Sequence, residues 1–252
     1  MTFAVIDDEG KTAKAIAGTP FTDPEYTGKE YALEDVRLLA PTLPSKVMAV
    51  GRNYADHVAE VFKKSAEHLP PTIFIKPSTA VVGPGAAIKI PEYATGVEFE
   101  GELALVVGVP CKNVKAADWK SVIRGVTIIN DVSSRDLQFA DGQWARAKGI
   151  DTFGPIGPWI ETDLEKFDFA NLPIKAHHTH NGVTETKQDS NSNQMIKTVG
   201  EMVEWVSESF TLLPGDVIAT GSPAGTAEMV PGDYIEVEIP GIGKLGNPVE
   251  RA

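Results

Sequence analysis

Residues 96–108 read Gly-Val-Glu-Phe-Glu-Gly-Glu-Leu-Ala-Leu-Val-Val-Gly, an acidic alternation that continues into an apolar run. In a β-strand every second side chain lies on the same face, so Glu98, Glu100 and Glu102 line one side, roughly 7 Å apart per step. The apolar residues that follow predict that the strand enters a protein core. The segment therefore predicts a carboxylate-bearing strand at the edge of a β-rich core.

Stacked carboxylates repel one another unless water or a cation lies among them. Mg²⁺, Mn²⁺ and Ca²⁺ take oxygen ligands of this kind. The alternative is a solvated acidic face on an edge strand. The buried-looking run 125–129 ends in Asn130-Asp131, and strand ends commonly present ligand groups, although Asp131 also suits a turn or a helix N-cap. Together these segments favour a hard-cation site.

The remaining pattern predicts a mostly β fold with some helix. Short runs rich in β-branched residues predict strands at 2–6, 12–16, 47–50, 72–75, 103–107, 126–129, 158–161, 217–220 and 234–239. Helices are expected at 54–66, 116–124 with Gly125 as C-cap, and 192–209 with Asn191 as N-cap. His177, His178 and His180 have no cysteine nearby, and we expect them in a surface turn rather than a zinc site.

Bulk properties exclude several classes of function. The 252 residues carry a net charge of −12, which disfavours nucleic acid or an anionic membrane as the main partner. The single cysteine forms no intrachain disulfide, and neither a signal sequence nor a long apolar run is present. We expect a cytoplasmic protein that binds neither nucleic acid nor membrane.

A possible acid/base pair lies in the stretch 51–60, where His57 and Glu60 fall three residues apart on one helical face. A carboxylate on one imidazole nitrogen orients the ring and leaves the other nitrogen free to take a proton. Exposed pairs at this spacing are also common without function. Arg135 and Lys148 follow Asp131 and would suit an acidic substrate.

Five motifs in this order resemble the fumarylacetoacetate hydrolase family over roughly residues 46–250. They are Gly51-Arg-Asn-Tyr-Ala-Asp-His57, Glu98-Phe-Glu-Gly-Glu-Leu-Ala104, Asn130-Asp-Val-Ser-Ser-Arg-Asp-Leu-Gln138, Lys148-Gly-Ile-Asp-Thr-Phe-Gly-Pro-Ile-Gly-Pro158 and Thr220-Gly-Ser-Pro-Ala-Gly225. The resemblance implies the mixed β-sandwich roll of that family as a catalytic domain at 46–252, usually a homodimer. Residues 1–45 match poorly, and we expect them to form a small β-rich N-terminal domain.

The resemblance also implies roles for individual residues. Metal ligands would be Glu100, Glu102 and Asp131, with Mg²⁺ or Mn²⁺ as the ion. We predict His57, Glu60 and Lys148 as catalytic residues, the first two on a short lid helix. Substrate contacts are predicted for Arg52, Tyr54, Arg135, Gln138 and Thr220.

The expected substrate is a small acidic 2-oxo acid. The resemblance implies metal-dependent cleavage of a C–C bond, either oxaloacetate decarboxylation or acylpyruvate hydrolysis, with Lys148 and Arg135 adding positive charge near the developing enolate. Two alternatives remain open. One is a 2-hydroxyhepta-2,4-diene-1,7-dioate isomerase/5-carboxymethyl-2-oxo-hex-3-ene-1,6-dioate decarboxylase of aromatic catabolism, and the other a catalytically silent binder of 2-oxo acids.

Overall fold

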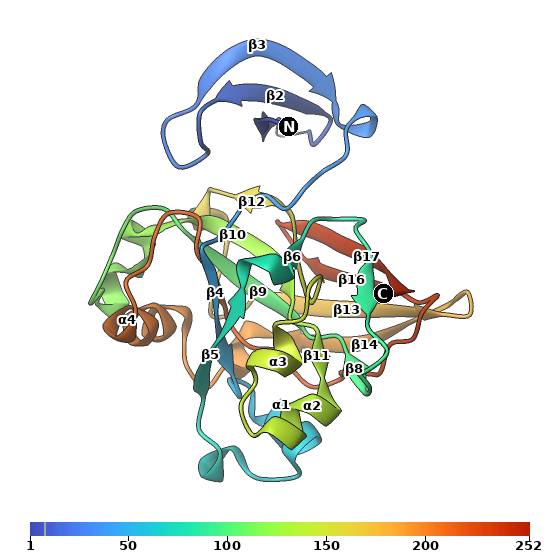
Figure 1. The fold of residues 1–252 in the computed structure, drawn as a ribbon. Coiled ribbons are helices and arrows are strands. Elements are labelled where there is room, and N and C mark those ends of the chain that lie inside the picture. The colour runs from blue at the N-terminus through green and yellow to red at the C-terminus, as the bar shows by residue number, and fades with distance from the viewer. Residues whose placement is uncertain (8) are drawn as a thin grey trace.

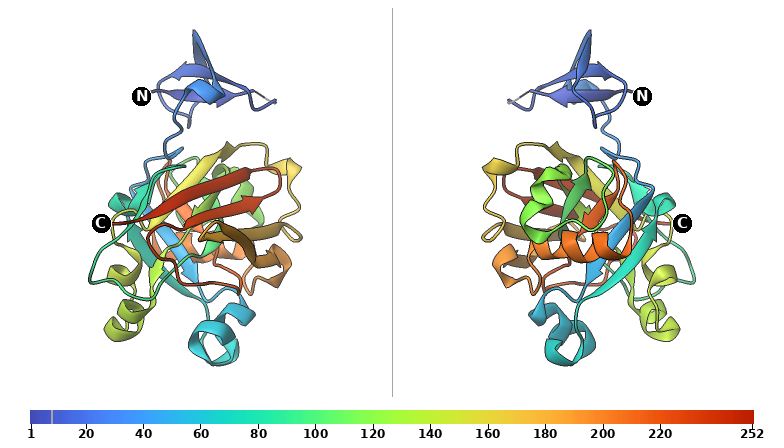
Figure 2. Two further views of the ribbon diagram at one scale, coloured as in Figure 1. Left: turned by 90° about the vertical axis from the view of Figure 1, so that its right-hand side faces the viewer. Right: turned by 90° about the vertical axis from the view of Figure 1, so that its left-hand side faces the viewer.

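The computed structural model describes residues 1–7 and 9–252. Two large β-sheets pack together, and a small third sheet near the N-terminus sits apart from them (Figures 1 and 2). The prediction of a mostly β fold with some helix is confirmed. No helix in the described ranges is long and apolar enough to cross a bilayer.

The larger sheet has seven strands and carries the acidic segment. Its order is β5 (Thr72–Pro77), β4 (Lys46–Gly51), β15 (Val217–Ala219), β9 (Gly101–Val107), β10 (Ile123–Asn130), β12 (Gly154–Glu161) and β6 (Val81–Val82). The β15–β4 and β12–β6 pairs are parallel, and the other pairs are antiparallel. The sheet is therefore mixed, with β9 at its centre.

The second sheet covers one face of the first. Its order is β14 (Val183–Asn191), β13 (Pro173–His180), β16 (Tyr234–Ile239), β17 (Gly243–Arg251) and β7 (Ile88–Ile90). Leu103 and Leu105 of β9 share one apolar cluster with Ile235 and Val237 of β16. Ala104, on the opposite face of β9, belongs to a second cluster. Both faces of β9 are covered, which explains why the strand is apolar from Leu103 to its end.

The N-terminal residues form their own three-stranded sheet, β1 (Phe3–Ile6), β2 (Thr12–Ala17) and β3 (Glu25–Ala32). Every residue of β3 is exposed. The Arg124 Nε donates to the carbonyl of Pro20 at 2.8 Å, which ties the segment after β2 to the start of β10. The chain then passes through the 3-10 helix η1 (Leu33–Asp35) to β4. The boundary at residue 45 stays a prediction.

Three helices lie at one end of the larger sheet (Figure 1). They are α1 (Ala55–Phe62), α2 (Arg135–Asp141) and α3 (Ala145–Lys148). The predicted helix 54–66 is shorter than expected, because Lys63 takes a left-handed conformation that ends α1. Neither α2 nor α3 was predicted from the sequence. The two-residue strands β8 (Val97–Glu98) and β11 (Ser133–Ser134) pair beside them.

The predicted helix 116–124 is wrong in type and length. Residues Ala116–Ser121 form a 3-10 helix, η4, and β10 begins at Ile123. Gly125 is a strand residue and not a C-cap. A Cβ there would lie 2.3 Å from the carbonyl oxygen of Glu161 on β12, so glycine permits a close approach of two strands.

The predicted helix 192–209 begins later than expected. Asn191 caps only the short 3-10 helix η6 (Ser192–Gln194), while α4 (Val199–Ser209) begins after Thr198. Thr198 and Glu201 form a reciprocal capping box, which satisfies two free N–H groups at once. The remaining 3-10 helices are η2 (Ala66–His68), η3 (Ser78–Ala80) and η5 (Leu164–Lys166).

The three histidines do not lie in a surface turn. His177, His178 and His180 belong to β13, in the middle of the second sheet's hydrogen-bonded strands. The side chain of His178 is buried. The expectation was wrong because the polar side chains of β13 form hydrogen bonds with side chains in, or next to, the two neighbouring strands.

Candidate metal centre and active site

The ends of β9 and β10 bring three carboxylates together. The two strands are antiparallel with Glu102 opposite Ile129, so the residues just before β9 face the residues just after β10. The Asp131 N–H donates to the Glu100 carbonyl at 2.8 Å, and the Glu100 N–H donates to Asn130 Oδ1 at 3.0 Å. Carboxylate oxygens of Glu100, Glu102 and Asp131 lie within 4.8 Å of one another, and all three residues are buried.

Buried cations surround two of these carboxylates. Lys148 Nζ lies 2.6 Å from Glu100 Oε2 and 2.7 Å from Asp131 Oδ2. Lys76 Nζ donates to the other oxygen of Asp131 at 2.5 Å. Arg135 Nη2 lies 2.6 Å from Glu100 Oε1. Burial alone would raise the pKa of Glu100, but the charges of Lys148 and Arg135 hold it well below its usual range.

Glu102 is different. Its Oε2 accepts from the Gly221 N–H at 2.7 Å, and it makes no ion pair within the described residues. Burial, followed by repulsion from Asp131 and Glu100, raises the pKa of Glu102 well above its usual value. A buried carboxylate in this position lacks positive charge, and a bound divalent cation would supply it.

The donor set fits such an ion. A carboxylate has about four acceptor directions. Asp131 uses two of them on lysines, and Glu102 uses one on a backbone N–H. Each of the three ligands is an oxygen, which suits Mg²⁺ or Mn²⁺ better than a thiolate- or imidazole-preferring metal.

The predicted acid/base pair lies against this cluster. His57 Nε2 is 3.3 Å from Glu100 Oε1, and its Nδ1 is 3.4 Å from Glu60 Oε2. Both oxygens of Glu60 accept from the Gly225 N–H at 3.1 Å, so the loop after β15 fixes α1 in place. Burial would lower the pKa of His57, but the contacts to Glu100 and Glu60 outweigh it and raise the pKa. The ring is held between two carboxylates.

The other predicted site residues lie at different distances from the cluster. Arg135 is buried, and its Nη1 donates to Gln138 Oε1 at 2.8 Å, so these two form one unit beside Glu100. The hydroxyl of Thr220 donates to the Leu103 carbonyl at 2.9 Å and is used within the sheet. The structure therefore joins Gln138 to the cluster through Arg135 and directs the Thr220 hydroxyl to the backbone.

Arg52 and Tyr54 lie at the end of β4. The Arg52 guanidinium lies 4.9 Å from the ring centres of both Phe62 and Trp144, a cation–π arrangement that links α1 to α3. The Tyr54 hydroxyl is buried without a hydrogen-bond partner among the described residues. Burial and the nearby charge of Glu102 raise the pKa of this phenol. Tyr54 thus lies near Glu102, whereas Arg52 packs against the Phe62 and Trp144 rings.

Lys76 and Asn130 belong to the site but were not among the predicted site residues. Lys76 is fully buried, and a lysine inside the apolar run Thr72–Pro77 is the signal that was available. Glu98 Oε2 accepts from Arg135 Nε at 2.7 Å and from the Thr226 hydroxyl at 2.8 Å. Glu98 therefore orients Arg135 and supports the site without belonging to the group of three clustered carboxylates.

Comparison with known proteins places this site in a family context. The family model described as fumarylacetoacetate (FAA) hydrolase C-terminal matches residues 46–250. A second model, described as Rv2993c-like, N-terminal, matches residues 1–41. Protein Rv2993c of Mycobacterium tuberculosis is 50% identical to this chain, over 100% of the chain and 94% of its own length. Oxaloacetate tautomerase Fahd2a, mitochondrial, of Rattus norvegicus is 39% identical over 85% of this chain and 69% of its own length.

Solved structures share the fold. Cg1458 with inhibitor has a TM-score of 0.95 at 75% identity, covering 96% of this chain and 90% of its own. A 2-hydroxyhepta-2,4-diene-1,7-dioate isomerase from Mycobacterium marinum has a TM-score of 0.85 at 50% identity, covering 95% and 88%. Fumarylpyruvate hydrolase from Pseudomonas aeruginosa, in complex with Mn²⁺ and pyruvate, has a TM-score of 0.74 at 28% identity, covering 83% and 91%.

Proposed function

Because the chain belongs to the fumarylacetoacetate hydrolase family, we propose that it is a divalent-metal-dependent enzyme that cleaves a C–C bond of a small 2-oxo acid. The reactions in view are oxaloacetate decarboxylation and acylpyruvate hydrolysis, both of which release pyruvate. The similar proteins named above include a hydrolase, an isomerase and a tautomerase. The shared requirement of these reactions is stabilisation of an enolate.

One observation carries the proposal. Three buried carboxylates converge at a point that also contacts Lys148, Arg135 and His57. Glu100, Glu102 and Asp131 would hold Mg²⁺ or Mn²⁺, and the fumarylpyruvate hydrolase structure with Mn²⁺ supports this assignment. When bound, the ion supplies a Lewis acid for a carbonyl oxygen.

The chain's own residues account for the rest of the chemistry. Lys148 Nζ and the Arg135 guanidinium place two fixed positive charges beside the carboxylates, where they stabilise an enolate oxygen as the C–C bond breaks. Glu60 orients His57, which exchanges a proton at Nε2 with water during hydrolysis or with the enolate carbon after decarboxylation. Helix α1 holds His57 and Glu60 beside Glu100, and an ordered α1 would limit the access of bulk water to that side of the site.

The experiment follows pyruvate release from metal-stripped protein after addition of Mg²⁺ or Mn²⁺. Oxaloacetate, acetylpyruvate and fumarylpyruvate serve as substrates. We expect metal-dependent turnover of one of them and its loss in Glu100→Ala, with Glu185→Ala, an exposed strand residue, as the control. Turnover that survives Glu100→Ala, or that metal fails to restore after chelation, would falsify the proposal.

A second candidate is isomerisation without bond cleavage. The 39% identity to the rat oxaloacetate tautomerase favours it, as does the placement of His57 between two carboxylates, which suits proton transfer without water attack. Following the ultraviolet absorbance of enol-oxaloacetate in the same samples separates the two. Metal-dependent decay of the enol without pyruvate release would identify an isomerase. Tight 2-oxo acid binding without either signal would identify the catalytically silent binder.

Three further predictions from the sequence remain predictions. They are the acidic 2-oxo acid as partner, the homodimer and the cytoplasmic location.

A further inference from the structure

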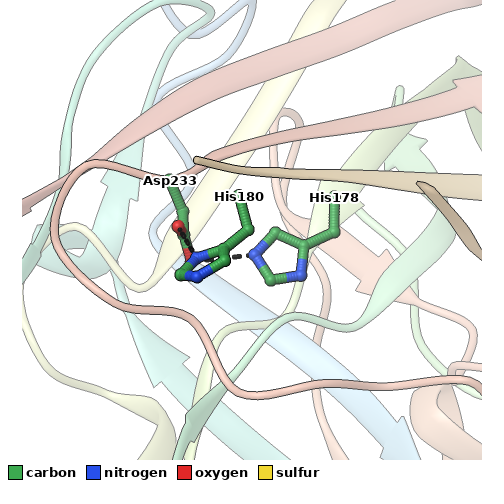
Figure 3. A group of neighbouring side chains, drawn as sticks. All are labelled: His178, His180 and Asp233. Carbon is green, nitrogen blue, oxygen red and sulfur yellow. Dashed lines mark hydrogen bonds and ion pairs between the residues drawn. The ribbon is translucent and has the colours of Figure 1, made fainter. Parts of the chain in front are cut away.

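A second group of possible metal ligands lies in the other sheet. His178 and His180 are alternate residues of β13, so their side chains share one face of the strand. Asp233 immediately precedes β16, the neighbouring strand, in which Tyr234 pairs with Thr179. Figure 3 shows the two imidazole rings together with the Asp233 carboxylate. We call these three residues the histidine cluster.

The cluster has a fixed carboxylate at its centre. His178 Nε2 lies 2.8 Å from Asp233 Oδ2, and His180 Nδ1 lies 2.7 Å from Asp233 Oδ1. One potential ligand atom from each residue lies within 4.8 Å of the others. The Val230 N–H also donates to Asp233 Oδ2 at 2.9 Å, and the Val249 N–H donates to the Asp233 carbonyl at 2.8 Å. The position of Asp233 is therefore set by the backbone on both sides.

We propose that the histidine cluster binds a borderline transition-metal ion such as Zn²⁺. This site is separate from the one formed by Glu100, Glu102 and Asp131, which we call the three-carboxylate centre. Two imidazoles and one carboxylate are a ligand set that such ions prefer and that Mg²⁺ does not. His178 and Asp233 are buried, whereas 53% of the His180 side chain is exposed, which gives an ion and its water ligands a route in.

The second nitrogen of His180 also has a suitable partner. His180 Nε2 lies 2.9 Å from Asn181 Nδ2. When Nδ1 binds a metal, the ring proton resides on Nε2 and needs an acceptor. Rotation of the Asn181 amide by half a turn presents its oxygen to that proton, because the two ends of an amide occupy nearly the same volume. The neighbouring residue thus accommodates both forms.

The fold separates this site from the catalytic carboxylates. The ring of His178 packs edge-on against Phe99, with ring centres 5.6 Å apart. Phe99 lies between Glu98 and Glu100 in the chain, and its ring contacts His178 whereas both glutamates contact Arg135, so its side chain lies on the opposite side of the segment. A metal bound by the histidine cluster would therefore stabilise residues 98–100 from the side of Phe99, without contacting substrate.

A neighbouring group is a weaker candidate. His177, Glu236 and Glu238 also place three ligand atoms together, on the other face of β13. Lys244 Nζ lies 2.7 Å from Glu236 and 3.4 Å from Glu238, so a cation is already supplied there. His177 therefore offers a matched control: a histidine on the same strand that we do not expect to hold the ion.

The test is a Zn²⁺ titration of tag-free, metal-stripped full-length protein, followed by competition with a chromophoric chelator. Millimolar Mg²⁺ is present throughout to fill the three-carboxylate centre. We expect one Zn²⁺ per chain, an affinity loss of more than about tenfold in His180→Ala, and no change in His177→Ala or Glu102→Gln. Circular dichroism of each variant verifies folding, and His180→Asn repeats the test with a polar side chain.

Three results would overturn the proposal. Zn²⁺ binding that is lost in Glu102→Gln and kept in His180→Ala would assign the ion to the three-carboxylate centre. Loss in His177→Ala alone would assign it to the opposite face of β13. Absence of Zn²⁺ binding by the wild-type protein in Mg²⁺ would leave the histidine cluster as a purely structural network. Pyruvate release is measured separately, so none of these outcomes depends on the proposed reaction.

Discussion

The three-carboxylate centre and the histidine cluster lie on the two sides of the same chain segment, and they manage buried negative charge in opposite ways. The first gathers Glu100, Glu102 and Asp131 and sets lysines and an arginine around them, yet leaves Glu102 without an ion pair in the described structure. The second shares one carboxylate, Asp233, between two imidazoles. The excess negative charge of the first group favours binding of a hard divalent cation. In the second group the contacts from the two imidazoles already stabilise the Asp233 carboxylate.

The amount of uncompensated charge separates a site that requires a cation from a site that is stable without one. Both groups contain ligand-type residues and both are largely buried. The difference is that burial and the charges of Asp131 and Glu100 raise the pKa of Glu102, while the Val230 N–H and the two histidines lower the pKa of Asp233 despite its burial. The first arrangement needs a cation for full stability, and the second does not.

The largest expected effect is that of Glu102→Gln on activity. Removing this ligand should lower metal-dependent turnover by about 10²–10³-fold, as loss of a key electrostatic contact does elsewhere. The same substitution removes repulsion, so the metal-free variant should melt at or above the wild-type temperature. Mg²⁺ should raise the melting temperature of the wild type but not of the variant. A similar Mg²⁺ response in both proteins would contradict the comparison.

The next effect concerns Lys76, the buried lysine on the Asp131 side of the centre. Lys76→Met should destabilise the metal-free protein by about 3 kcal/mol, because it leaves a buried carboxylate with one fewer cation. Urea unfolding measures this, with the exposed Lys244→Met as control, for which we expect less than about 0.5 kcal/mol. Mg²⁺ should restore part of the loss in Lys76→Met. A stability equal to wild type would show that Lys148 alone balances Asp131.

Much of the site was predictable because its signals are local. The alternation of Glu98, Glu100 and Glu102 ahead of an apolar run predicts one strand with an acidic face. The structure divides that strand: Glu98 ends β8, Glu102 lies in β9, and Glu100 lies in the link between them. The run 125–131 likewise reports a strand ending in a carboxylate. Their meeting follows from antiparallel pairing of β9 with β10, which the sequence does not state. The family resemblance supplied that link, and the fold confirmed it.

What failed depended on contacts between distant segments. Gly125 was predicted as a helix C-cap, but it is a strand residue where the Glu161 carbonyl occupies the space that a Cβ would need. Asn191 suited an N-cap, but the capping box at Thr198 is stronger because two N–H groups are satisfied reciprocally. His178 and His180 looked like surface residues because their partner, Asp233, lies more than fifty positions away in the chain.

A third effect distinguishes the histidine cluster by its pH dependence. Burial would raise the pKa of Asp233, but contacts from the Val230 N–H, His178 and His180 outweigh it. They lower this pKa below its unfolded value of about 3.9. The ionised carboxylate therefore stabilises the fold fully above about pH 4, and this contribution is lost as the pH falls through the folded pKa. Asp233→Asn should cost about 1–3 kcal/mol at neutral pH.

Urea unfolding of Asp233→Asn and wild type between neutral pH and about pH 3 checks this. The difference between them should shrink as the solution becomes acidic. Glu185→Gln is the control, because this exposed glutamate also lies near His178 and contributes to the local charge. A difference that stays constant over the whole range would mean that Asp233 acts through shape and not through charge.

The smallest effect is that of His180→Ala on the metal-free protein. The His180 side chain is 53% exposed, so its contact to Asp233 competes with water and should contribute about 1 kcal/mol or less. Turnover should remain within about twofold of wild type, since Phe99 and His178 separate His180 from the carboxylates. With millimolar Mg²⁺ filling the three-carboxylate centre, added Zn²⁺ should raise the melting temperature of the wild type and leave that of His180→Ala unchanged. A large loss of Mg²⁺-dependent turnover in His180→Ala, measured without Zn²⁺, would instead show that the two sides of the segment are coupled, and that the histidine cluster belongs to the catalytic machinery.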